Sequence, residues 1–131
     1  MASIFTKIIS GEIPAYKIAE DENFFAFLDI SPLEEGHTLV VPKLEVDYIF
    51  DLEDDLLAKL HLFSKKVAKA IDASVDCKRV GVAVVGLEVP HAHIHLIPLH
   101  KDAINFAQVR KSFSKKELEQ LANKIASKVI L

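Results

Sequence analysis

The sequence predicts one domain in which helices pack against a β-sheet, and three observations lead to this prediction. Apolar residues recur at helical spacing over residues 52–73 and again after Ser114. Short β-rich runs, bounded by proline and glycine, lie before and between these two segments. At 131 residues, the chain suits a single domain that buries about two-thirds of its unfolded surface. We therefore expect one domain over residues 1–131.

The first half begins with a short helix over residues 3–11, which Gly11 ends. Strand-like runs follow at residues 15–20, 23–29 and 38–43, and Pro32 and Gly36 mark a turn between the last two. The helix over residues 52–73 should cover one face of the sheet, with Asp51 as its candidate N-cap.

The second half contains two β-rich runs and a final helix. Residues 79–86 and 91–97 are four residues apart and predict a hairpin or a closely linked pair of strands. Ser114 and Glu117 have the spacing of a capping box, and Phe113 with Leu118 can form the hydrophobic staple. We expect a packing helix whose apolar stripe comprises Leu118, Leu121, Ala122, Ile125 and Val129.

The composition is that of an ordinary globular protein, with half of the residues apolar and 27% charged. The net charge is -3 and the lysines are scattered, which disfavours nucleic-acid binding but leaves a small anionic ligand possible. No apolar stretch is long enough to span a membrane, and the N-terminus lacks the pattern of a signal peptide. The only cysteine, Cys77, agrees with a reducing compartment, so we expect a cytoplasmic protein with no membrane partner.

The run HAHIHLIP places His91, His93 and His95 at two-residue spacing. A β-strand alternates its faces with period two, so the three rings should project from one face. Histidine titrates near neutral pH, and such a face can supply a nucleophile, a proton donor and a phosphate ligand. We therefore expect the chemistry of the protein on this strand.

Two other interpretations of the histidines are a satisfied polar core and a metal site. Three buried rings on one strand face are difficult to satisfy with hydrogen-bond partners. The first and third Cα atoms would lie about 13 Å apart in a strand, a strained span for one small ion. A metal held by two of the histidines and an outside residue stays open. His61 and His100 have no motif around them and are expected at the surface.

HAHIHLI resembles the His-φ-His-φ-His-φ-φ motif, with φ apolar, of the histidine triad (HIT) family. Residues 3–43 are similar to the opening of the Hint branch in IF-x-KII, EIPA, AF-x-DISP and GH-x-LV-x-PK. The resemblance implies a HIT-like α+β fold. Its antiparallel sheet has about five strands, a long helix packed on it, and helices at both ends of the chain.

The resemblance also implies an activity and the residues that perform it. HIT enzymes of this kind are usually homodimers that bind a purine nucleoside monophosphate unit and split the bond between its α-phosphate and a leaving group. By position, His93 is the nucleophile that forms a nucleotidyl-histidine, and His95 contacts the phosphate and the leaving group. His91 and His37 would support the site, and this chemistry needs no metal or other cofactor.

The resemblance further assigns substrate-binding residues, which would otherwise be interpreted as core or turn positions. Asp29 matches the ribose-binding aspartate, and Gly86, Leu87 and Glu88 align with the phosphate loop. The positions that enclose the base are matched by Ile4, Phe5, Ile8, Phe27, Leu28, Ile30 and Leu39.

The chain departs from the family pattern in two places. Leu87 stands where a glutamine is expected, and Val80 or Gly81 stands near the place of an asparagine. Some relatives carry Cys-x-x-Cys where this chain has Ser3 and Thr6, so we expect no structural zinc.

The sequence thus predicts a Hint-like hydrolase or transferase for nucleoside 5′-monophosphates bonded to an amine, a phosphate or an acyl group. The alternatives are a Fhit-like dinucleoside polyphosphate hydrolase, a nucleotide-binding module with weak turnover, and a metal-dependent enzyme.

Overall fold

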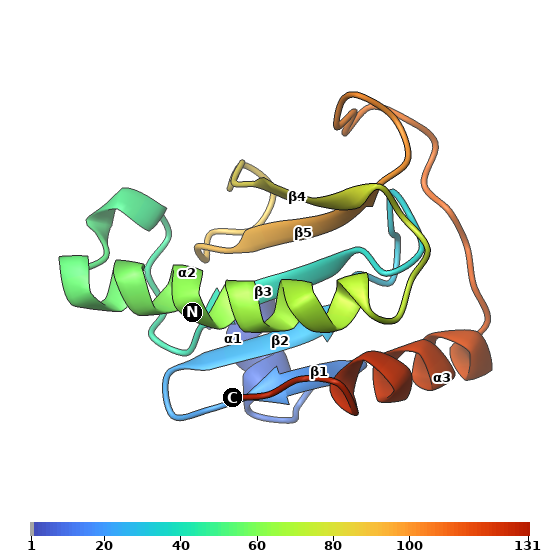
Figure 1. The fold of residues 1–131 in the computed structure, drawn as a ribbon. Helices are drawn as coiled ribbons and strands as arrows, with labels where there is room; N and C mark the ends of the chain where they lie inside the picture. The colour runs from blue at the N-terminus through green and yellow to red at the C-terminus, as the bar shows by residue number, and fades with distance from the viewer. Residues whose placement is uncertain (1) are drawn as a thin grey trace.

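The computed structural model describes residues 2–131, which form a five-stranded antiparallel sheet in the order β1-β2-β3-β5-β4 (Figure 1). The five-stranded α+β fold predicted from the sequence is confirmed. The strands are β1 (Lys17–Glu20), β2 (Phe24–Leu28), β3 (Thr38–Pro42), β4 (Arg79–Ala83) and β5 (Ile94–Leu99). The helices are α1 (Ile4–Ile9), the 3-10 turn η1 (Ile49–Asp51), α2 (Asp54–Asp72) and α3 (Lys115–Ala126).

The sheet separates two apolar clusters, because successive side chains of a strand point to opposite faces. On β2, Phe24, Ala26 and Leu28 join the larger core under α2 and α3. Phe25 and Phe27 point the other way and pack with Phe5 of α1. Figure 1 shows α2 lying across one face of the sheet and α1 behind it. The side of the sheet that carries α1 is the side on which the histidines lie.

The α2 helix packs through an apolar stripe that includes Leu60, Phe63 and Val67. The predicted N-cap at Asp51 is wrong, because Asp51 belongs to η1 and the helix begins after Glu53. The chain makes this extra turn while burying Ile49 and Leu52, which sequence periodicity did not reveal. Of the helices in residues 2–131, none is long and apolar enough to cross a membrane.

The α3 helix begins as its sequence predicts. Ser114 Oγ accepts a hydrogen bond from Glu117 N at 3.1 Å, and Glu117 Oε1 accepts one from Ser114 N at 2.9 Å. This reciprocal capping box satisfies two amide groups at the helix start. Leu118, Ala122 and Ile125 are buried against the larger core.

Strands β4 and β5 pair as the predicted hairpin, with Ala83 opposite His95. The β-structure is shorter than expected, however, because β4 ends at Ala83 and β5 begins at Ile94. His91 and His93 therefore precede the strand, where Ala92 N bonds to the carbonyl of Val46. The expected alternation is nevertheless kept, since Ala92, Ile94 and Leu96 all enter the larger core.

Candidate active site

A cleft of about 530 Å³ opens on the α1 side of the sheet. Its walls come from α1, the end of β2, the β4–β5 connection and the segment that follows β5. Nine residues predicted for the site line this cleft: Ile4, Phe5, Asp29, Leu39, Gly86, Leu87, Glu88, His93 and His95. The fold thus gathers most of the predicted positions around one opening.

The hydrogen bond of His93 to the His91 carbonyl defines the tautomer of the neutral His93 ring. Its Nδ1 lies 2.7 Å from the carbonyl oxygen of His91, and only an N–H can bond to that oxygen. The neutral ring therefore carries its lone pair on Nε2. Burial lowers the pKa of His93 and outweighs its hydrogen bond to His91, so the ring is neutral at pH 7. Phe5 packs edge-on against it, with ring centroids 5.0 Å apart.

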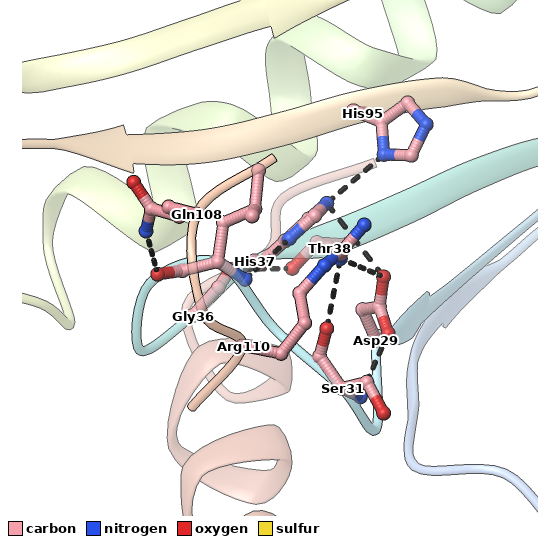
Figure 2. A network of polar contacts seen from close by, with 9 residues as sticks. Asp29, Ser31, Gly36, His37, Thr38, His95, Gln108 and Arg110 are labelled. Atoms are coloured by element: carbon pink, nitrogen blue, oxygen red, sulfur yellow. Dashed lines mark hydrogen bonds and ion pairs between the residues drawn. The ribbon is translucent and has the colours of Figure 1, made fainter. Parts of the chain in front are cut away.

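His37 and His95 form a hydrogen-bonded pair in which the position of each ring proton is defined. The amide of Leu33 donates to His37 Nδ1 at 3.0 Å, which leaves the proton of the neutral His37 ring on Nε2. That N–H donates to His95 Nδ1 at 3.0 Å, so the neutral His95 ring carries its proton on Nε2 (Figure 2). Burial, reinforced by repulsion from neighbouring positive charges, lowers the pKa of His37 to about 3 and that of His95 to about 4.

His91 lies fully buried behind His93. Its Nε2 donates to the carbonyl of Pro42 at 2.7 Å, and its Nδ1 lies 2.7 Å from Ser3 Oγ. Ser3 is also the N-cap of α1, where its hydroxyl accepts from Thr6 N. Glu45 accepts from Ser3 N at 2.7 Å and from Thr6 Oγ1 at 2.6 Å. These bonds lower the pKa of Glu45 to about 2, and the whole network fixes the carbonyl that orients His93.

Asp29 follows β2 and turns its carboxylate toward the cleft. Its Oδ1 accepts from Ser31 N at 2.8 Å, and its Oδ2 lies 3.8 Å from His37 Nε2. Burial raises the pKa of this carboxyl, while the Ser31 bond and the Arg110 charge oppose the rise. A partly buried acceptor of this kind can bind the two hydroxyls of a sugar.

Five predicted site residues lie near the cleft without lining it. His37 and His91 are completely buried and reach the cleft only through His95 and His93. Phe27 lies behind Phe5, with ring centroids 5.6 Å apart. Ile8 packs against the same apolar cluster. Ile30 is exposed and does not line the cleft.

Leu28 is placed differently from all of these. It points to the opposite face of the sheet and belongs to the core under α2. Because side chains alternate along β2, Phe27 and Leu28 cannot both face the cleft. The structure therefore gives Leu28 a packing position.

Several cleft residues were missed by the sequence analysis: Ser31, Val85, Val89, Phe106 and Arg110. Phe106 and Arg110 belong to residues 100–114, here called the return segment, which connects β5 to α3. Gln108 bonds to the carbonyl of Leu33 and Arg110 to that of Ser31, so this segment lies along the loop before β3 (Figure 2). The segment has no periodicity or motif, and no signal in the sequence could have placed it here.

The histidines are not arranged as a metal site. Within residues 2–131, no group of three or more His, Cys, Asp or Glu side chains could hold an ion together. Both nitrogens of His37 and of His91 are instead engaged in hydrogen bonds.

Comparisons with known proteins identify a family and relatives that match most of the chain. The model of the HIT domain matches residues 10–102. The "Protein hit" of Bacillus subtilis is 33% identical over 137 residues, covering 96% of this chain and 93% of that protein. The adenosine 5′-monophosphoramidase hnt1 of Schizosaccharomyces pombe is 34% identical over 132 residues, covering 98% and 99%.

A solved structure of a HIT-like protein is also similar to this chain over most of its length. The Hit-like protein involved in cell-cycle regulation from Bartonella henselae superposes with a TM-score of 0.83 at 31% identity, covering 95% of this chain and 94% of that one. The family match spans more than half of the chain, and it includes His37, His91, His93 and His95. The chain belongs to the histidine triad, or HIT, family.

Proposed function

We propose that this protein hydrolyses purine nucleoside 5′-phosphoramidates and related derivatives through a nucleotidyl intermediate on His93. One observation carries the proposal: the His91 carbonyl leaves the lone pair of the neutral His93 ring on Nε2, in a ring that lines the cleft. Beside it, with ring centroids 4.9 Å apart, His95 carries its proton on Nε2. A nucleophile and a hydrogen-bond donor are thus adjacent.

In this proposal, the leaving nitrogen takes a proton from solvent, and His93 Nε2 then bonds to phosphorus while the bond from phosphorus to that nitrogen breaks. The amine departs, and the charge of the phosphorylated ring is stabilised by the bond from Nδ1–H to the His91 carbonyl. His95 Nε2–H donates to a phosphoryl oxygen. Water then attacks phosphorus, the bond to His93 breaks, and the nucleoside monophosphate and one proton are released.

The remaining walls of the cleft fit the rest of a nucleotide. Asp29 supplies an acceptor for the ribose hydroxyls, and Ile4, Phe5 and Leu39 supply an apolar slot for the base. Gly86, Leu87 and Glu88 can offer backbone N–H groups to the phosphate. The similarity to a named adenosine 5′-monophosphoramidase supports this choice of substrate.

We extend the proposal to the assembly and location of the protein, a cytoplasmic homodimer. Exposed apolar side chains gather around a second cavity of about 470 Å³ that also reaches His93. Among them are Tyr48, Phe50, Val84 and Leu87. A patch of this kind is typical of an interaction surface.

The test is a quenched reaction with adenosine phosphoramidate, followed by mass spectrometry of the peptides. We expect AMP on the peptide that contains residues 91–98, and no turnover by His93→Ala although it still binds AMP. The matched control is His100→Ala, which removes an exposed histidine that lines neither this cleft nor the second cavity and should leave turnover unchanged. Strong turnover by His93→Ala would falsify the mechanism. Acyl adenylates and dinucleoside polyphosphates, measured in parallel, rank the leaving groups.

A further inference from the structure

The β4–β5 connection offers little to hold a phosphate with its side chains. Its residues on the cleft are Val85, Gly86, Leu87, Glu88 and Val89, which provide no side-chain N–H or O–H donor and one negative charge. Asp29 adds a second negative charge. His93 and His95 are uncharged at neutral pH because burial lowers their pKa values. The positive charge that an anion needs must come from elsewhere.

The return segment supplies that charge. Arg110 is the only lysine or arginine among the described residues that line the cleft. Its side chain is half-buried, and its Nη1 donates to the carbonyl oxygen of Ser31 at 2.8 Å. A guanidinium has five N–H donors in a rigid fork, so donors remain for a ligand.

Arg110 lies where a nucleotide would change from sugar to phosphate. Its Nη1 is 3.7 Å from Asp29 Oδ2, the expected ribose acceptor. Phe106, from the same segment, packs edge-on against His95, with ring centroids 4.9 Å apart. Figure 2 shows the Arg110 side chain reaching back from the return segment toward Asp29 and Ser31. The positive charge of Arg110 also contributes to the lowered pKa of His95, so the guanidinium lies near both the ribose end and the His95 end of the cleft.

We propose that Arg110 binds the phosphate anion of the nucleotide, so that the return segment provides the positive charge that the β4–β5 connection lacks. This inference rests on the proposed function, because it concerns the same cleft. It assigns a specificity: the cleft selects 5′-phosphorylated nucleosides over neutral nucleosides through a residue far from the histidine motif in the sequence.

A purely structural role for Arg110 predicts a different behaviour. If the guanidinium only held Asp29 or the Ser31 loop in place, its loss would weaken the binding of every ligand that contains ribose. If it binds the phosphate, its loss weakens charged ligands and leaves the neutral nucleoside nearly unaffected. AMP and adenosine differ only in the 5′-phosphate and separate the two roles.

The experiment is calorimetry of the whole chain with AMP and with adenosine, for the wild type and four variants. Arg110→Gln should weaken AMP binding roughly tenfold or more, the usual loss for a charged hydrogen bond, and change adenosine binding less than about twofold. Arg110→Lys should recover part of the AMP affinity because it keeps the charge without the fork. Asp29→Asn is the reference for lost ribose contacts and should weaken the binding of AMP and of adenosine by a similar factor.

Lys111→Gln is the matched control. Lys111 pairs with Glu34 at 2.9 Å and does not line the cleft, so its charge lies in the same segment without facing a ligand. It should leave both affinities unchanged. The wild type should also lose AMP affinity as salt rises, and Arg110→Gln should lose less.

Equal losses of AMP and adenosine in Arg110→Gln would overturn the inference, and so would an unchanged AMP affinity. Failure of the wild type to bind either ligand would instead overturn the proposed function. A variant that failed to fold would bind neither ligand at all, whereas a purely structural role for Arg110 predicts partial and equal losses of both affinities.

Discussion

At the scale of single residues, the site depends on where protons lie. Two backbone groups, the His91 carbonyl and the Leu33 amide, determine which nitrogen of His93 and of His37 carries hydrogen. The N–H of His37 in turn bonds to His95 Nδ1, which leaves the proton of the neutral His95 ring on Nε2. In the proposed mechanism, fixed partners of this kind keep the His93 ring ready to attack and the His95 ring ready to donate, without requiring either ring to be charged.

This arrangement predicts how stability depends on pH. The pKa values of His37 and His95 are about 3 and 4 in the folded chain, below the ordinary 6.5 expected when unfolded. The unfolded chain therefore binds more protons below pH 6.5, and stability is lost as the pH falls through that range. At pH 5, about 1.5 units below the pKa of the unfolded chain, each histidine lowers the free energy of unfolding by about 2 kcal/mol. The free energy of unfolding should fall by about 2–4 kcal/mol between pH 7 and pH 5.

Urea unfolding at several pH values measures this loss. The carboxyl groups with lowered pKa values, such as Glu34 and Glu45, lose their contribution mainly below pH 5 and do not dominate the window. The raised pKa of Asp29 acts in the opposite direction. His95→Asn keeps an acceptor for His37. In this variant, the slope of the free energy of unfolding against pH should be smaller by about 1.4 kcal/mol per pH unit. Equal slopes in the two proteins would contradict the assignment.

At the scale of elements, the turn before β3 shows how the backbone positions His37. Gly36 has a φ of +95°, in the left-handed region that favours glycine. A Cβ built there would lie 3.0 Å from Val75 Cγ2 and 3.2 Å from Pro98 Cγ. The turn therefore packs tightly against Val75 and Pro98, and the next residue, His37, is completely buried.

Gly36→Ala should destabilise the protein by more than the strain of its φ alone, because the methyl group also displaces packed atoms. Gly11→Ala is the matched control, since Gly11 has a φ of +87° and a Cβ added to it would meet nothing within 4 Å. We expect a loss of about 1–2 kcal/mol in the control and a larger loss in Gly36→Ala, measured by urea unfolding. Similar losses in both variants would show that the turn is not tightly packed.

The elements also show what the sequence could predict. The α3 helix starts where its capping box indicates, because Ser114 and Glu117 interact locally. The alternation of residues 91–96 predicted which residues enter the core, although pairing with β3 and β4 set a later strand start. The start of α2 was misplaced because burial of Leu52, not a cap, decided it. Arg110 was missed because only the fold brings it to Asp29, 81 positions earlier in the chain.

At the scale of the whole molecule, the β4–β5 connection stands between two cavities. One is the cleft with Asp29, and the other is lined by residues of η1 and α2, yet Gly86, Leu87 and His93 line both. Leu87 is 89% exposed and Phe50 is 70% exposed, although both are large apolar side chains. A second copy of the chain that covered this patch would close the side of His93 that the isolated chain leaves open.

Phe50→Glu should therefore convert the proposed homodimer to a monomer, because it places a charge where an apolar side chain is expected to be buried. Burying such a side chain contributes about 1.5–3 kcal/mol per subunit, so its loss in both copies should lower dimer affinity by several orders of magnitude. Ile130→Glu, which changes an apolar residue that is 84% exposed near the C-terminus, is the control and should stay dimeric. Light scattering at micromolar concentration distinguishes the two states, and a wild-type monomer there would remove the dimer from the proposal. If the second copy closes the His93 side of the site, Phe50→Glu should also turn over adenosine phosphoramidate more slowly while binding AMP in the Asp29 cleft as before, since that cleft lies within one chain.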